Sequence, residues 1–115
     1  YAQRGSGRRS SFYSDFTFGL WRDEELLPIG KAYFGFTDAE LVELDKWVRH
    51  HTLKTFGPVR EVRKELVFEV AFDAVHRSTR HKSGYALRFP RISRIRWDKP
   101  AAEADHLTAL ERLMG

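Results

Sequence analysis

Arginines and one phenylalanine near the end of the chain form the pattern with the clearest chemistry. Spacings of three, three and two residues separate Arg88, Arg91, Arg94 and Arg96 on one expected strand. Side chains of a strand alternate between its faces, so the odd spacings distribute these arginines over both faces. A guanidinium group suits phosphate oxygens. Phe89 lies between two of them, and it either packs in a core or, if exposed, inserts into a minor groove or stacks on a base.

Other familiar chemistries find little support in the sequence. The chain has no cysteine, which excludes disulfides, zinc–cysteine sites and a cysteine nucleophile. Its 5 histidines include no His-x-x-x-His pair, so packed or surface histidines are the better interpretation. No Gly-x-Ser-x-Gly or Gly-x-x-x-x-Gly-Lys motif occurs, and the two glycines Gly5 and Gly7 lack the third glycine of a dinucleotide fingerprint.

The positive charge is concentrated in two parts of the chain. The formal net charge is +4, but residues 76–99 hold eight basic residues and one acid, and residues 1–10 hold three arginines and no acid. Residues 11–75 carry 12 acidic and 8 basic residues. Such a polarised distribution suggests a polyanionic partner, nucleic acid or nucleotide phosphate, and a solvated basic loop is the alternative.

Length and composition predict one folded domain without a membrane span. The chain has 115 residues, of which 42% are hydrophobic and 14% aromatic. No apolar run approaches the roughly 18 residues of a transmembrane helix, and the first ten residues lack a signal-peptide core. Because the sequence starts at Tyr1 and not at Met, we expect residues 1–115 to be a single domain of a longer protein.

The first half of the chain predicts strands followed by a helix. A possible strand end opens the chain, residues 12–21 alternate aromatic and polar side chains, and residues 26–34 are a further strand candidate. Thr37 and Glu40 form a capping box for a helix of about four turns that ends near residues 52–57.

The second half predicts two long strands and a final helix. Residues 65–75 alternate strongly, residues 76–84 form a basic loop, residues 85–97 form a strand broken at Pro90, and residues 101–114 form a helix. This order is typical of a mainly β protein, a five-stranded OB-fold barrel with a helix between strands 3 and 4 and a C-terminal helix. A small sheet with helices on one face is the alternative.

The stretch from Arg88 to Lys99 resembles motif VI of ATP-dependent DNA ligases. In that family an R-F-P-R run leads into an R-x-D-K signature near the end of a C-terminal OB domain, and here the signature is Arg96-Trp97-Asp98-Lys99. Trp97 departs from the polar residue that relatives often carry there. Nearly the whole chain is covered in order, with further matches at Tyr1–Arg9 (G-x-G-[KR]-R), Phe36–Leu41 (F-[ST]-D-x-E-L), Glu65–Phe72 and Ser83-Gly84.

The resemblance implies a role within a larger enzyme. Such ligases transfer AMP from ATP, with a divalent metal such as Mg²⁺, to a lysine in a K-x-D-G motif, then to the 5′-phosphate of a nick in duplex DNA, which they seal in repair or replication. This chain has no K-x-D-G motif. The resemblance therefore implies an upstream adenylation domain, and it implies that this fragment alone is inactive and binds no cofactor. It also implies a DEXH-box helicase as a further partner and no membrane association. The expected location is the bacterial cytoplasm, at the nucleoid.

The resemblance also assigns roles to residues. Arg96, Asp98 and Lys99 would orient the departing pyrophosphate during lysine adenylation, although a structural salt bridge of Asp98 with Arg96 or Lys99 is the plainer alternative. Phe89 would press on the DNA minor groove near the nick. The remaining expected DNA contacts are Arg8, Arg9, Arg77, Arg80, Lys82, Arg88 and Arg91.

Three other functions stay open at this point. An autonomous OB module for single-stranded nucleic acid would share the barrel, the basic groove and the aromatics. The OB domain of an RNA ligase or a capping guanylyltransferase belongs to the same superfamily. A domain that docks an acidic protein partner would bind nucleic acid weakly at physiological salt.

Overall fold

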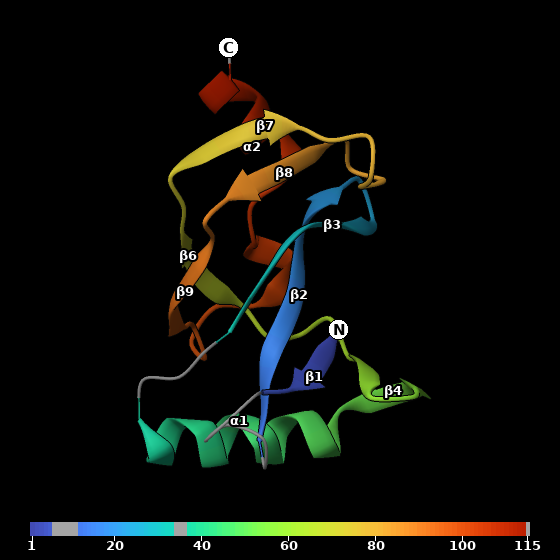
Figure 1. The fold of residues 1–115 in the computed structure, drawn as a ribbon, viewed down its shortest axis with the longest axis vertical. Coiled ribbons are helices and arrows are strands. Elements are labelled where there is room, and N and C mark those ends of the chain that lie inside the picture. Colours follow the sequence, from blue (N-terminus) through green and yellow to red (C-terminus); the bar gives the residue numbers. More distant parts are fainter. Residues whose placement is uncertain (6–11, 34–36, 115) are drawn as a thin grey trace. The chain divides into compact units, whose positions relative to one another are not determined.

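The computed structural model describes residues 1–5, 12–33 and 37–114. These residues form two α-helices, a 3-10 helix and short antiparallel strands (Figure 1). The helices are α1 (Asp38–His50), η2 (Ala101–Glu103) and α2 (Leu107–Met114). The strands are β1 (Ala2–Arg4), β2 (Tyr13–Arg22), β3 (Glu25–Tyr33), β4 (Thr52–Phe56), β5 (Val59–Val62), β6 (Phe68–Ala71), β7 (Ala74–Arg77), β8 (Tyr85–Arg88) and β9 (Arg91–Ile95).

The fold is mainly β and is consistent with the predicted OB fold. One sheet has five strands in the order β3-β2-β1-β5-β4, and two further sheets pair β6 with β9 and β7 with β8. Over the described residues the strands do not close into a barrel. Phe89 and Pro90 separate β8 from β9, and the two-stranded ladders β7–β8 and β6–β9 end on either side of them. Phe89 has a φ of 51°, and Pro90 has no N–H to donate to a ladder.

The chain divides into two compact units. Unit 1 comprises residues 1–16 and 32–63, and unit 2 comprises residues 17–31 and 64–115. None of the helices in the described ranges is both long and apolar enough to cross a membrane.

Unit 1 joins the first strand to helix α1 and the hairpin that follows. In β1, Ala2 pairs with Phe16 of β2 and with Arg60 of β5. Helix α1 buries one apolar stripe, Leu41, Leu44 and Val48, as its spacing predicted. One half of the predicted capping box is confirmed, because the Thr37 hydroxyl accepts a hydrogen bond of 3.1 Å from the backbone N–H of Glu40. In place of the other half, the Thr37 hydroxyl donates to the Glu40 carboxylate at 2.9 Å.

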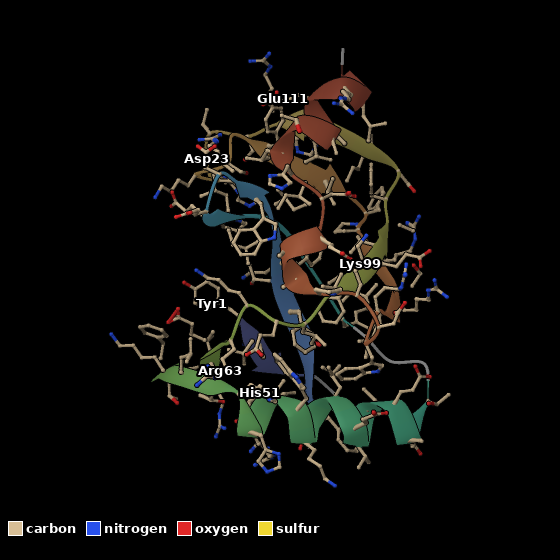
Figure 2. All side chains as sticks on the ribbon, turned by 180° about the vertical axis from the view of Figure 1, so that it is seen from behind. Tyr1, Asp23, His51, Arg63, Lys99 and Glu111 are labelled. Carbon is tan, nitrogen blue, oxygen red and sulfur yellow. The ribbon has the colours of Figure 1, made fainter. Side chains whose placement is uncertain are left out.

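Helix α1 ends at His50, earlier than the predicted end near residues 52–57. The His51 ring contacts the Trp47 carbonyl through Nδ1 at 2.7 Å, and the Thr52 hydroxyl donates to the Val48 carbonyl at 2.7 Å. These side chains take the last helical carbonyls, and the chain turns into β4; Figure 2 shows His51 at this end of α1. The strands β4 and β5 were not predicted, since their residues are mostly exposed or half-buried and show no apolar alternation.

Unit 2 holds a core of leucines and isoleucine between strands and helix α2. The fully packed members are Leu27, Ile29, Leu87, Leu107 and Leu110. They come from β3, β8 and α2, so this core holds the β8 part of the 85–97 segment against β3 and α2. Helix α2 packs on β7.

Two long elements predicted for unit 2 are interrupted. The strand expected over residues 65–75 is split into β6 and β7, and the helix expected over residues 101–114 is a 3-10 turn followed by α2. The indole N–H of Trp21 donates to the Ala101 carbonyl at 2.8 Å, and its backbone N–H donates to the Asp105 carbonyl at 3.3 Å. These tertiary bonds use carbonyls that a continuous helix would need.

Candidate nucleic-acid and nucleotide site

Phe89 lies exposed at the tight turn between β8 and β9. Its side chain is 61% exposed, which excludes the core placement that the sequence left open. Its φ of 51° is in the left-handed region, which is unfavourable for a residue with a large side chain. The Arg91 guanidinium donates to the Phe89 carbonyl at 2.8 Å, and the Asp73 backbone N–H donates to the Arg88 carbonyl at 2.9 Å. These bonds hold the turn in the conformation that presents the ring to solvent.

The cations around this turn differ in whether an acid already neutralises them. Arg91 pairs with Asp73 at 3.1 Å, whereas Arg88 lies with its Cζ 5.2 Å from the centroid of the Phe89 ring. Within the described ranges Arg88 makes no ion pair. Its charge is therefore available to a phosphate without first breaking a contact with a carboxylate.

The basic loop between β7 and β8 is built around one buried hydroxyl. Ser83 is 1% exposed, and its Oγ donates to the Pro28 carbonyl at 2.8 Å and accepts from the Tyr85 N–H at 3.3 Å. The Arg22 guanidinium donates to the Ser83 carbonyl at 3.2 Å. Gly84 follows with a φ of 84°, a conformation that glycine adopts without strain. These contacts fasten the loop to the strands β2 and β3.

This anchor carries three of the expected DNA contacts. Arg77 ends β7, and Arg80 and Lys82 lie in the loop, all exposed. Lys82 forms an ion pair of 2.6 Å with Glu25, which lowers the pKa of that carboxyl. No acid pairs with Arg77 or Arg80 in the part of the chain that the structure describes.

Replacing Ser83 by alanine should destabilise the fold measurably. The Ser83→Ala change leaves the Pro28 carbonyl without its buried donor, at an expected cost of about 1–3 kcal/mol. For a chain of this size we expect thermal unfolding to begin roughly 5 °C lower or more. Ser93→Ala is the matched control, because the Ser93 hydroxyl donates to the Glu69 carbonyl at an exposed position. Equal unfolding temperatures for the two variants would contradict the anchoring role.

Arg96 and Asp98 form a forked ion pair just after β9. The Arg96 Nε and Nη2 donate to the two Asp98 oxygens at 3.1 and 3.2 Å. The salt bridge that we set beside the catalytic role is therefore present. It uses two of the five N–H donors of the guanidinium and leaves the others for a second acceptor. The backbone of this segment is tied down as well, because the Arg96 N–H donates to the Val67 carbonyl at 2.8 Å.

The ion pair has an electrostatic signature that can be measured. Hydrogen bonds from Arg96 lower the pKa of the Asp98 carboxyl below its ordinary value. The pair is thus intact at neutral pH and is lost as the pH falls through that lowered pKa. We expect Arg96→Gln to raise the pKa of Asp98 and to leave the pKa of Glu25 unchanged. NMR titration of the carboxyl carbons measures both pKa values. Lys82→Gln should do the reverse, and a variant that shifted both carboxyls would contradict separate pairs.

Lys99 completes the signature at the turn before η2 (Figure 2). Its backbone N–H donates to the Arg96 carbonyl at 3.2 Å, so the Arg96–Lys99 segment folds back on itself. The structure thus brings together Arg96, Asp98 and Lys99 as neighbours in one turn. Arg8 and Arg9 lie outside the described residues.

The described residues do not offer a metal site. No group of three or more His, Cys, Asp or Glu side chains comes together among them.

Sequence reasoning missed one group of cations in unit 1. The Cζ atoms of Arg4, Arg49 and Arg60 all lie near the ring of Tyr13. Tyr13, at the start of β2, is only 5% exposed, so the residue around which these cations gather is buried. No spacing in the sequence connects residues so far apart along the chain.

Comparison with known proteins gives one consistent result. Residues 9–99 match the family described as "ATP dependent DNA ligase C terminal region". A protein of Koribacter versatilis named probable DNA ligase is 55% identical over 109 residues, which is 95% of this chain and 19% of that protein. A probable DNA ligase of Opitutus terrae is 50% identical over 113 residues, 95% of this chain and 11% of that protein. A DNA ligase of Halorubrum lacusprofundi is 40% identical over 115 residues, 99% of this chain and 19% of that protein. The chain thus spans about a fifth or less of the length of these relatives.

Proposed function

Because the chain belongs to the family of C-terminal regions of ATP-dependent DNA ligases, we propose that it serves as one C-terminal domain of a longer nick-sealing ligase. In this proposal residues 1–115 bind duplex DNA at the nick and assist the transfer of AMP from ATP to a lysine of an upstream domain. Sealing of nicks in DNA repair or replication is the activity proposed for the whole protein. A DEXH-box helicase remains a proposed partner.

The exposed turn at Phe89 carries the DNA-binding part of the proposal. An apolar ring that is 61% exposed and held in a left-handed backbone conformation contributes nothing to the core, so a partner is the natural reason for it. The minor groove offers such a ring sugar and base edges to press on. Arg88 beside it supplies a cation for the flanking phosphate, and Arg77 and Arg80 supply further ones.

The turn at Arg96 supports the nucleotide part of the proposal. Negative charge grows on the pyrophosphate as it departs from ATP, and a positioned cation stabilises it. Asp98 would hold the Arg96 guanidinium in place with two of its donors while the rest meet phosphate oxygens. Lys99 would add a second cation. Asp98 is then a positioning residue for Arg96.

Binding of DNA by the 115-residue chain tests the first part. We expect fluorescence anisotropy to show binding to nicked and intact duplex that weakens steeply with salt, by about 0.9 in the log–log slope for each phosphate contact. Preference for single-stranded DNA would favour the autonomous OB module instead. Absence of binding at low salt would remove the DNA-clamping role.

A further inference from the structure

Three arginines of unit 1 surround a single buried tyrosine. The guanidinium Cζ atoms of Arg4, Arg49 and Arg60 lie 5.2, 5.3 and 4.8 Å from the centroid of the Tyr13 ring. They come from β1, α1 and β5, three elements that are distant along the sequence. We call these four residues the Tyr13 cluster.

The backbone and one carboxylate fix the Tyr13 cluster. Asp45 accepts the backbone N–H of Tyr13 through Oδ1 at 2.8 Å and pairs through Oδ2 with the Arg49 Nε at 2.7 Å. The same contact raises the pKa of Arg49. Register places Arg4 opposite Tyr13 and Arg60 opposite Ala2. All three cations are thus brought to one ring by secondary structure and not by long flexible loops.

At least one cation of the cluster keeps its charge without a carboxylate. The three guanidinium carbons lie within 5.3 Å of one ring centroid, so three cationic groups are gathered around a single side chain. Asp45 neutralises Arg49, but Arg60 donates to the uncharged hydroxyl of Thr52 at 3.5 Å. Within the described residues Arg60 makes no ion pair. Guanidinium groups gathered around one aromatic ring, with Arg60 unpaired by any carboxylate of the described residues, suit a phosphate group that bridges them.

We propose that the Tyr13 cluster binds a phosphodiester group of the duplex DNA backbone. This inference rests on the proposed function only in taking DNA as the polyanion. The site uses residues of unit 1 that are separate from the Phe89 turn and from the Arg96 turn. It would therefore add phosphate contacts that fix the position of the duplex without reading its sequence.

Charge-removing variants of the 115-residue chain test this site. We expect Arg60→Gln and Arg4→Gln each to lower the slope of log affinity against log salt by about 0.9 on duplex DNA, with several-fold weaker binding at low salt. Lys46→Gln is the matched control, because Lys46 is an exposed cation on α1 outside the cluster. Inorganic pyrophosphate is added as a competitor in a second arm.

The outcomes separate this site from the rest of the proposal. The site is overturned if Arg60→Gln and Arg4→Gln have the same salt slope as Lys46→Gln. This holds even where their unfolding temperatures change, because a purely structural role alters stability and not the salt slope. Equal slopes together with weaker binding by Phe89→Ala would leave the proposed function standing without this site. Lowered slopes with no effect of Phe89→Ala would support the site and count against the Phe89 turn. Loss of DNA binding at equimolar pyrophosphate in the wild-type chain but not in Arg60→Gln would assign a free anion to the cluster and overturn the backbone assignment.

Discussion

Phe89→Ala should weaken binding of nicked duplex DNA about tenfold or more without lowering the stability of the fold. The ring is 61% exposed, so its removal costs little core packing. Loss of an aromatic contact with nucleic acid costs roughly 1–3 kcal/mol per base by alanine substitution. Fluorescence anisotropy on nicked duplex, with thermal unfolding recorded beside it, measures both quantities.

Two further variants sharpen this prediction. Phe89→Gly removes the ring and also suits the φ of 51°, so we expect it to bind as weakly as Phe89→Ala and to unfold at the same or a higher temperature. Leu113→Ala is the matched control, because Leu113 on α2 is 65% exposed and belongs to no proposed site. A Phe89→Ala variant that binds like Leu113→Ala would remove Phe89 from the interface. The slope of log affinity against log salt should stay unchanged for Phe89→Ala and fall for Arg88→Gln, because only the second substitution removes a positive charge.

Arg96→Ala should lower self-adenylation of the longer protein about 100-fold or more. A preorganised donor aimed at developing charge typically contributes a factor of about 10²–10³ to the rate. The sealing of a nick that is already adenylated needs no departing pyrophosphate, so we expect this step to change much less. Gel assays of the two steps with separate substrates give the comparison.

Neighbouring variants control for changes of fold and charge. Arg94→Ala removes a cation two residues earlier that pairs with Glu69 at 2.6 Å, and we expect near-normal adenylation. Asp98→Asn should weaken adenylation less than Arg96→Ala, because the guanidinium remains but loses its fork. The division of roles is wrong if Arg96→Ala impairs both steps equally or only the second.

The sequence alone determined those elements whose signals are local. The capping residues Thr37 and Glu40, the stripe of α1 and the break at Pro90 all act within a few positions of the chain. Motif order was sufficient to identify the ligase family, which the comparisons confirm. The arginines near Phe89 were found because their residue types and spacing are visible in one short stretch.

Only the tertiary structure decided which side chains meet. Phe89 is apolar, and its exposure follows from a turn held by Arg91 and Asp73. Lys82 is neutralised by Glu25, which lies 57 positions away in the sequence. Arg88 has no acidic partner among the described residues. Periodicity reports the preferred face of a strand, whereas ion pairs depend on register and on the approach of separate elements. The same reason explains the hairpin of β4 and β5, the interrupted C-terminal helix and the three arginines at Tyr13, where long-range contacts override or escape local pattern.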